Sequence, residues 1–357
     1  MSLFLFNFAL PLKALIKTIT MQNTLIPITF PRQNPLPDGA TLLAADIGGT
    51  KTDMALFAVE NGQPVLKEER RYASAEWDSL VGMARDFSGE ADLPKRMCIS
   101  FAGPVKQGNA QGTNLPWDIR SQAIRQALNM ETVFLINDLE ANSYGLAALQ
   151  EDDLQVIYPG ENLQPGNGAV ISPGTGLGEG GLYWDGKAYR PFATEGGHTH
   201  FAPRNDLDWR LFKYLSEQYG HVSWERVVSG MGITNLFRFM RDVEQLEAPA
   251  SFDRIEAPAI SRAAAEGDLI SQWTLRLFFR YLAEEAANLA MKFKATGGIY
   301  IGGGIVPQIW NDAHHEIFNE YFFAVGRLSP LIKSVPVTLI LNQKTALLGA
   351  GWYGAFG

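Results

Sequence analysis

The sequence predicts an α/β fold with two domains, each a mixed β-sheet flanked by helices. Two observations support this fold class. An apolar strand runs into a loop of glycine and threonine at 42–50, and the same pattern returns at 170–178. Around these loops, apolar runs of strand length alternate with stretches of helical periodicity. The 357 residues suffice for two domains of ordinary size, so we expect a duplicated fold.

The first glycine loop indicates phosphate binding. Gly48 and Gly49 lack a Cβ atom, so the backbone can turn tightly and bring its N–H groups close to an anion. Thr50 adds a hydroxyl donor, and Asp46 at the end of the strand is suited to hold Mg²⁺ directly or through water. Taken alone, this signal is weak, because two glycines after a strand are often just a hairpin turn. The second loop favours the phosphate interpretation, with a nucleotide held between the two halves.

Composition excludes several classes of protein. The net charge of −8, without a cluster of Lys and Arg, argues against nucleic-acid binding. The single cysteine, Cys98, rules out an intramolecular disulfide and a cysteine-rich zinc site. Its apolar neighbours predict a buried structural thiol. A hydrophobic content of 46% with 19% charged residues is typical of a soluble globular enzyme.

The N-terminal segment does not match a secretory signal or a membrane span. Lysines follow the apolar run Met1–Leu12, whereas a signal peptide has its positive charge first. The run is also shorter than the ~20 residues that a helix needs to cross a bilayer. We expect an appendage at 1–40, a small α/β domain at 41–149 completed by a C-terminal helix at 340–357, and a large α/β domain at 150–339.

The first domain should contain, in order, a strand before the glycine loop, two strands joined by a turn, and an alternation of helices and strands. Asn61-Gly62 is a strong signal for that turn. The expected elements are strands at 54–59, 67–73, 97–101 and 132–136 and helices at 77–87 and 139–149. The stretch 151–168, rich in Pro, Gly and Asn, reads as the connection between domains.

The second domain repeats the pattern and adds helices. Strands are expected at 168–172, 181–184, 187–191, 298–301 and 337–341, and helices at 209–218, 273–294 and 345–353. The strand at 298–301 ends in three glycines, Gly302–Gly304. The glycine spacing at 176–181 matches a dinucleotide fingerprint, but that motif must open a helix and here it precedes a predicted hairpin.

Asp138 is the strongest candidate for catalysis. It follows a buried strand, at the edge of the sheet where α/β folds place reactive groups. A single carboxylate within hydrogen-bond reach of a sugar hydroxyl is what phosphoryl transfer to that hydroxyl needs. The alternative is that Asp138 caps the helix at 139–149, a frequent role for aspartate. The two roles are compatible.

Three further polar residues suit a ligand with several hydroxyl groups. Glu195 and His198 lie in a stretch otherwise built from Phe, Ala, Gly and Pro, and Glu225 follows downstream. Two carboxylates and an imidazole can accept from and donate to hydroxyls held at fixed positions. The alternative for Glu225 is a structural ion pair with Arg226 or another base. His198 and His200 could share a face of an extended segment, but further zinc ligands are not evident.

Five motifs stand in a fixed order, namely Asp46–Thr50, Asn137-Asp138, Gly174–Gly178, Glu195–His198 and Glu225–Gly230. In this order the chain resembles the bacterial-type glucokinases, members of the sugar kinase, actin and heat-shock ATPase fold. The resemblance covers roughly residues 41–357. It implies two ribonuclease H-like domains with an interdomain cleft, the actin-like ATPase fold. The implied activity is ATP-dependent phosphorylation of glucose at its 6-hydroxyl, the entry to glycolysis.

The resemblance also implies roles for individual residues. Asp138 matches the catalytic base, and the implied sugar ligands are Asn137, Glu195, His198 and Glu225. The implied nucleotide-binding residues are Asp46, Ile47, Gly48, Gly49, Thr50, Thr175, Gly176, Gly303 and Gly304. Mg²⁺, held by Asp46, is the implied cofactor. A cytoplasmic enzyme that binds glucose and ATP, and neither nucleic acid nor membrane, is expected.

Two other functions stay open at this point. One is a kinase for another hexose, such as fructose, mannose or an amino sugar. The other is a non-catalytic sugar sensor on the same fold, which would have no need for both a base and a magnesium carboxylate. The cysteine-rich zinc motif of the lineage shared with sugar-responsive repressors is absent from the sequence. The choice between ATP, ADP and polyphosphate as donor, and between monomer and homodimer, is also open.

Overall fold

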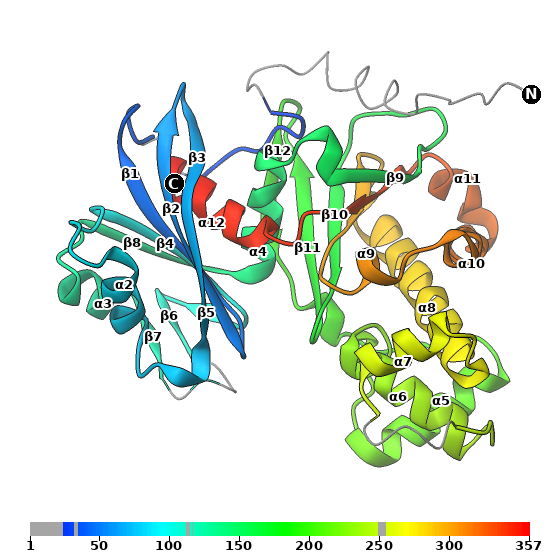
Figure 1. Cartoon of the computed structure of the whole chain (residues 1–357). Helices are drawn as coiled ribbons and strands as arrows, with labels where there is room; N and C mark the ends of the chain where they lie inside the picture. The colour runs from blue at the N-terminus through cyan, green and yellow to red at the C-terminus, as the bar shows by residue number, and fades with distance from the viewer. Residues whose placement is uncertain (1–23, 32–34, 112–114, 116, 249–254) are drawn as a thin grey trace, which may run out of the picture. The chain divides into compact units, whose positions relative to one another are not determined.

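The computed structural model describes residues 24–31, 35–111, 115, 117–248 and 255–357 (Figure 1). These residues form two compact units, which we describe separately. Unit 1 contains the described residues of Leu154–Gly186 and Thr194–Leu341. Unit 2 contains those of Ile16–Asp153, Lys187–Ala193 and Asn342–Gly357. The chain therefore leaves unit 2 after Asp153, four residues beyond the predicted boundary, and its C-terminal segment belongs to unit 2.

Unit 2 is built on a five-stranded mixed sheet of order β3-β2-β1-β4-β8. Its strands are β1 (Thr41–Ile47), β2 (Lys51–Glu60), β3 (Gln63–Ala73), β4 (Arg96–Phe101) and β8 (Thr132–Asn137). The β1–β2 and β2–β3 pairs are antiparallel, and β1, β4 and β8 run parallel. Asn61 and Gly62 have φ values of 52° and 73°, as the predicted tight turn between β2 and β3 requires.

Helices and short strands complete unit 2. They are α2 (Leu80–Ser88), α3 (Ser121–Ala127), α4 (Asp138–Gly145), α12 (Thr345–Phe356), β5 (Val105–Lys106), β6 (Asn109–Ala110), β7 (Ile119–Arg120), β12 (Tyr189–Ala193) and the short 3₁₀ helices η1 (Ser74–Glu76), η2 (Leu146–Ala148) and η3 (Glu151–Asp153). α2 begins three residues later than predicted because the Ser79 hydroxyl accepts a hydrogen bond from Gly82 N and caps the helix there. α12 packs against α4 and β1.

Part of the predicted N-terminal appendage is integrated into unit 2. Ile26, Ile28 and Phe30 are buried, and Ile28 forms a parallel bridge with Tyr189. The Phe30 ring stacks on Tyr144, with a centroid distance of 5.2 Å. The prediction of a separate appendage is therefore wrong for the described part of 1–40, while 1–23 and 32–34 lie outside the described residues.

Unit 1 contains the strand order β11-β10-β13-β14-β9. These strands are β9 (Leu154–Tyr158), β10 (Gly168–Pro173), β11 (Leu177–Trp184), β13 (Gly298–Ile301) and β14 (Val337–Ile340). β10 pairs antiparallel with β11 and parallel with β13, and β13 pairs parallel with β14. This is the same connectivity as β2-β1-β4-β8 in unit 2. The duplicated α/β fold predicted from the two glycine loops is thus confirmed, sheet by sheet.

The helices of unit 1 supply most of its core. They are α5 (Asp206–Tyr219), α6 (Gly230–Asp242), α7 (Ala257–Ala265), α8 (Leu269–Phe293), α9 (Val306–Ile309), α10 (Asp312–Phe322), α11 (Ser329–Ile332), η4 (Gly196–His198), η5 (Trp224–Arg226) and η6 (Gly326–Leu328). α8 is largely buried and contacts α6, α7 and α10. Among the described residues, no helix combines the length and the apolar character needed to traverse a bilayer.

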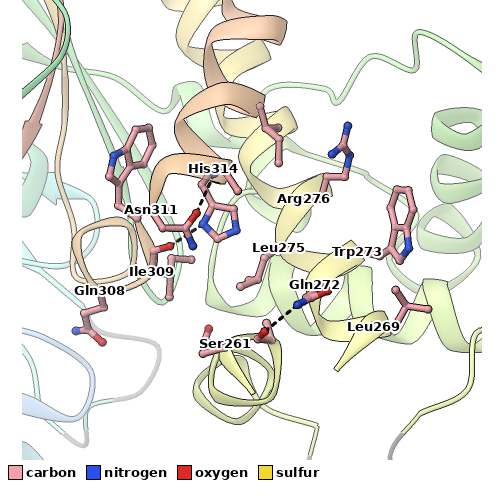
Figure 2. Close-up of a pocket in the computed structure, with 15 residues that line it drawn as sticks. Ser261, Leu269, Gln272, Trp273, Leu275, Arg276, Gln308, Ile309, Asn311 and His314 are labelled. Carbon is pink, nitrogen blue, oxygen red and sulfur yellow. Dashed lines mark hydrogen bonds between the residues drawn. The ribbon is translucent and has the colours of Figure 1, made fainter. Parts of the chain in front are cut away.

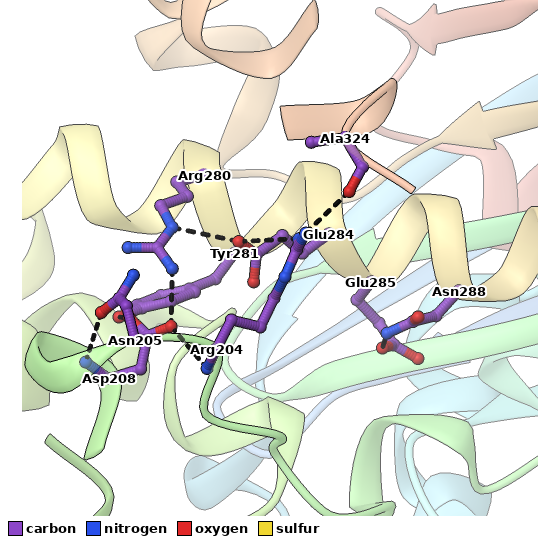
Figure 3. A network of polar contacts seen from close by, with 9 residues as sticks. All are labelled: Arg204, Asn205, Asp208, Arg280, Tyr281, Glu284, Glu285, Asn288 and Ala324. Atoms are coloured by element: carbon purple, nitrogen blue, oxygen red, sulfur yellow. Dashed lines mark hydrogen bonds and ion pairs between the residues drawn. The ribbon is translucent and has the colours of Figure 1, made fainter. Parts of the chain in front are cut away.

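A buried network of charges ties α8 to α5 (Figure 3). Asp208 accepts hydrogen bonds from Arg280 Nη2 at 2.6 Å and from the Tyr281 hydroxyl at 2.9 Å. Glu284 Oε1 accepts from Arg280 Nε at 3.0 Å and pairs with Arg204 at 3.2 Å. Because each buried charge faces an opposite charge, the ion pairs offset part of the cost of removing these groups from water.

Candidate functional site

The first glycine loop is the turn of the β1–β2 hairpin, so the hairpin interpretation is correct as geometry. Gly48 N donates to Lys51 O at 2.9 Å and closes the turn. Ser74 braces it from the side, since its N–H donates to Thr50 O and its hydroxyl to Gly48 O. Gly49 and Thr50 remain exposed. A braced turn with exposed residues at its tip is available to bind an anion.

Asp46 lies on β1, two residues before this turn, and is partly exposed. Its Oδ1 accepts a 2.6 Å hydrogen bond from the hydroxyl of Ser100 on β4. Burial raises the pKa of Asp46 to about 6, opposed by the Ser100 hydrogen bond and by Lys51 and reinforced by Asp53. Among the described residues, Oδ2 has no hydrogen-bond partner. One available carboxylate oxygen fits Mg²⁺, which keeps several waters and usually binds proteins through one or two carboxylates plus substrate phosphates.

Asn137 and Asp138 stand where β8 passes into α4. Asn137 caps the helix, because its Oδ1 accepts from Leu139 N at 2.9 Å and from Glu140 N at 3.4 Å. Its Nδ2 donates to Gly103 O, which leaves one amide hydrogen for a ligand. Asp138 is half-buried and occupies the first helical position, with Oδ1 accepting from Leu139 N at 3.0 Å. The capping role that competed for Asp138 therefore belongs to Asn137.

The second glycine loop is the turn between β10 and β11 in unit 1, the counterpart of the first. Gly174 N donates to Gly176 O at 2.8 Å, and Gly174 O accepts from Gly230 N at 2.8 Å. Gly230 is the first residue of α6, whose cap is the Ser229 side chain. Gly303 has φ +83°, and a Cβ there would collide with Pro173 O. Within unit 1, the second glycine loop, the glycines at 302–304 and the N-terminus of α6 thus meet, an arrangement that suits phosphate.

Glu225 connects this loop to the predicted sugar ligands. Its Oε2 accepts a hydrogen bond from Leu177 N at 3.0 Å, directly after the glycine turn. Its Oε1 lies 4.0 Å from His198 Nδ1. Arg226 does not pair with it, because the guanidinium stacks over the Tyr219 ring at 3.9 Å. The alternative ion pair between Glu225 and Arg226 is therefore not formed.

Glu195 and His198 belong to one turn around η4. His198 N donates to Glu195 O at 3.0 Å, and both side chains are exposed. Thr194 holds the turn, since its hydroxyl accepts from Gly196 N and donates to Glu179 O. The structure thus brings His198 and Glu225 together next to the second glycine loop, and Glu195 belongs to the same turn as His198. Among the described residues, no three His, Cys, Asp or Glu side chains are grouped to bind a metal ion.

A cavity of about 590 Å³ lies between α7, the start of α8 and α10 (Figure 2). Its lining includes Ser261, Gln272, Trp273, Gln308 and His314. These residues are scattered over more than fifty positions and carry no motif, so sequence patterns do not reveal them. The one usable signal was proximity in sequence, since Gln308 follows the glycines of the 302–304 loop.

The chain is similar to known glucokinases over nearly its whole length. The glucokinase family model matches residues 43–355. A glucokinase of Nostoc sp. is 38% identical over 332 residues, covering 87% of this chain and 97% of that protein. A glucokinase of Synechocystis sp. is 36% identical over 344 residues, with the same coverage of both chains.

Solved structures agree with this result. The crystal structure of a glucokinase from an Antarctic psychrotroph has a TM-score of 0.75 and 33% identity, covering 88% of this chain and 98% of that one. A ROK-family glucokinase from Streptomyces griseus, in complex with glucose and AMPPNP, has a TM-score of 0.61 at 22% identity, covering 89% of this chain and all of that one. The second likeness concerns the fold, whereas the family model and the closer relatives define the family. The chain belongs to the glucokinase family.

Proposed function

We propose that this member of the glucokinase family transfers the γ-phosphoryl group of ATP to the 6-hydroxyl of D-glucose, giving glucose 6-phosphate and ADP. One observation carries the proposal. Glu225 accepts a hydrogen bond from Leu177 N, directly after the second glycine loop, which we call the phosphate loop. Its carboxylate also lies 4.0 Å from His198 Nδ1 in the turn at 194–198, which we call the sugar turn. A phosphotransferase must bind donor and acceptor next to each other, and this carboxylate joins the two sets of residues.

On the acceptor side, Glu195, His198, Glu225 and the remaining amide hydrogen of Asn137 bind the sugar hydroxyls in this proposal. Asp138 accepts the proton of the 6-hydroxyl as the oxygen attacks the γ-phosphorus. The bond between the γ-phosphorus and the bridging oxygen of ADP breaks at the same centre. Phosphoryl transfer asks little covalent chemistry of the protein, so positioning and charge neutralisation supply most of the rate.

On the donor side, the two glycine loops bind the triphosphate through backbone N–H groups, with Thr50 and Thr175 as hydroxyl donors. The exposed position of both threonines and the N-terminus of α6 at Gly230 support this assignment. Asp46 would hold Mg²⁺ through Oδ2. When bound, the ion neutralises part of the phosphate charge.

The adenosine end of ATP occupies the edge of the 590 Å³ cavity in this proposal. Gln308 at the cavity rim follows Gly304 by four positions, and α7, which supplies Ser261, begins at Ala257. A Cβ at Gly230 would meet Ala257 Cβ at 4.0 Å and Ile305 Cδ1 at 3.6 Å. The segments that line the cavity therefore adjoin, in sequence, the residues that surround the phosphate loop.

An assay of ADP release, with glucose present and with or without Mg²⁺, tests the proposal. The same assay with fructose, mannose and glucosamine tests the acceptor, and ADP or polyphosphate in place of ATP tests the donor. We expect the highest kcat/KM with glucose, ATP and Mg²⁺, in an enzyme that acts in the cytoplasm. A higher kcat/KM with another hexose would identify a different hexose kinase. Glucose binding without turnover would identify a sugar sensor.

A further inference from the structure

Glu179 is a buried carboxyl group that the mechanism does not use. It lies on β11, is 1% exposed, and neither side-chain oxygen has a hydrogen-bond partner among the described residues. An ionised carboxylate in such surroundings is costly, so the uncharged acid is favoured. Burial, reinforced by the nearby Glu285, raises the pKa of Glu179 to about 8, and Lys292 opposes the rise. At neutral pH the side chain is therefore mostly protonated.

The carboxyl group of Glu179 lies directly beneath the sugar turn. A Cβ at Gly196 would collide with its Oε2 and would stand 2.9 Å from its Cδ. Its backbone oxygen accepts from the Thr194 hydroxyl at 2.8 Å, and that hydroxyl accepts from Gly196 N at 3.1 Å. Gly196 is flanked by Glu195 and lies two residues before His198. The position of both proposed sugar ligands therefore depends on what lies under Gly196.

The charged groups around Glu179 explain why the proton resides there. On α8, the fully buried Glu285 accepts from Lys292 Nζ at 3.1 Å. It also accepts from Asn288 Nδ2 at 2.8 Å (Figure 3). Glu285 thus has partners for a negative charge and Glu179 has none among the described residues. In the turn, the titratable residues are Glu195 and His198, whose side chains are exposed, while the paired strand β10 carries no charged residue. Ionised Glu179 would place a second buried negative charge near Glu285.

We propose that Glu179 is a positioning residue for sugar binding, which supports the 194–198 turn as an uncharged acid and disturbs it when ionised. The proposal rests on the proposed function, because it assigns Glu195 and His198 to glucose. It predicts that alkaline pH weakens glucose binding through a group that does not touch the sugar. The donor loops should be affected less, because the collision at Gly196 concerns the sugar turn.

The test measures KM for glucose, KM for ATP and kcat from pH 6.5 to 9.5, together with the Kd of glucose from tryptophan fluorescence. In the parent protein we expect KM and Kd for glucose to rise about tenfold between pH 7 and pH 9, as titration near pH 8 implies. Glu179→Gln should match the parent at pH 7 within about twofold and should lose the alkaline rise. Glu285→Gln is the matched control, since removing the like charge should move the rise to lower pH.

A double-mutant cycle of Gly196→Ala and Glu179→Ala gives a second, independent measurement. Gly196→Ala should raise the Kd of glucose at pH 7, because its Cβ collides with the Glu179 carboxyl group. Adding Glu179→Ala should restore part of the affinity, because that variant removes the colliding atoms. Strictly additive effects in the cycle, or an alkaline rise that persists in Glu179→Gln, would overturn the proposal. The Kd separates the two hypotheses: glucose binding with this pH dependence but without turnover contradicts only the proposed function.

Discussion

The hydroxyl of Ser100 on β4 donates a 2.6 Å hydrogen bond to Asp46 Oδ1 on the adjacent parallel strand β1. Asp46 and Ser100 are register partners in the sheet, so the hydrogen bond holds the carboxylate at the mouth of the first glycine loop. Oδ2 is left for a metal. A hydrogen bond to a charged acceptor typically contributes about 1.5–3 kcal/mol, which makes Ser100 a sensitive point of the donor site.

We expect Ser100→Ala to raise KM for MgATP by at least about tenfold, with the KM for glucose little changed. The carboxylate loses the donor that orients it, and the metal site becomes less well ordered. Titration of activity with Mg²⁺ at fixed ATP checks the result. Ser271→Ala is the control, because Ser271 is a buried serine on α8 whose hydroxyl has no partner among the described residues. Equal Mg²⁺ titrations of Ser100→Ala and the parent would contradict the role of the pair.

Asp138→Asn should lower kcat by at least ~10², the usual scale for losing a general base, while the Kd of glucose stays near that of the parent. The fold should be retained, because Asn137 and not Asp138 caps α4. Asn137→Ala, in contrast, removes the cap of α4 and should lower the free energy of unfolding by about 1 kcal/mol. Measuring kcat and urea unfolding for both variants separates catalysis from capping. A kcat for Asp138→Asn within a few-fold of the parent would leave the enzyme without this base.

Much of the fold and the site could be predicted from local sequence patterns. The glycine loops, the Asn61-Gly62 turn and the strand that leads into Asp138 depend on neighbours within a few positions, and the structure contains them. Ser100 and Glu179 act on residues 54 and 17 positions away, so their roles appear only when strands pair and turns pack. Leu177 shows the same limit: β11 begins there rather than at 181 because Pro173 pairs with Leu177 across the glycine turn.

The N-terminal segment shows a different limit. The apolar run at 1–12 is the most conspicuous pattern of this segment, whereas the buried residues of its described part include Ile26, Ile28 and Phe30. Their partners, Tyr189 on β12 and Tyr144 on α4, are more than a hundred positions away. Local sequence periodicity does not predict contacts between positions so far apart.

Glu225→Gln and Glu225→Ala should differ in their KM for ATP, because only Gln can still accept the hydrogen bond from Leu177 N. Gln retains an oxygen that can accept from Leu177 N, so Glu225→Gln should raise the KM for glucose at least tenfold and leave the KM for ATP nearly unchanged. Ala leaves that N–H without its acceptor and should raise both KM values. His198→Ala should behave like Glu225→Gln. A rise confined to the KM for ATP in these variants would place both residues on the donor side.

Ser261→Trp should obstruct the cavity and raise the KM for ATP at least about fivefold, with glucose binding unchanged. The Ser261 hydroxyl donates to Ala257 O within α7, so the side chain lies against its own helix and the larger ring must extend into the cavity space. Leu269→Ala, at an exposed position of the same lining, is the control and should leave the KM for ATP unchanged. An unaltered KM for ATP in Ser261→Trp would show that adenosine lies elsewhere.

The raised pKa of Glu179 also predicts how stability depends on pH. The folded protein keeps the proton up to about pH 8, whereas the unfolded chain releases it near 4.5, so folding binds a proton between these values. The free energy of unfolding should therefore fall as pH rises from 4.5 to 8, by ~3 kcal/mol from this group between pH 5 and pH 8. Glu179→Gln cannot release a proton and should lose this part of the slope, becoming more stable than the parent at pH 8 but not at pH 4.5. Urea unfolding of both proteins at the two pH values measures the difference directly. If the two proteins lose stability in parallel with pH, Glu179 is ionised in the folded state, and the support it gives to the sugar turn as an uncharged acid would be refuted as well.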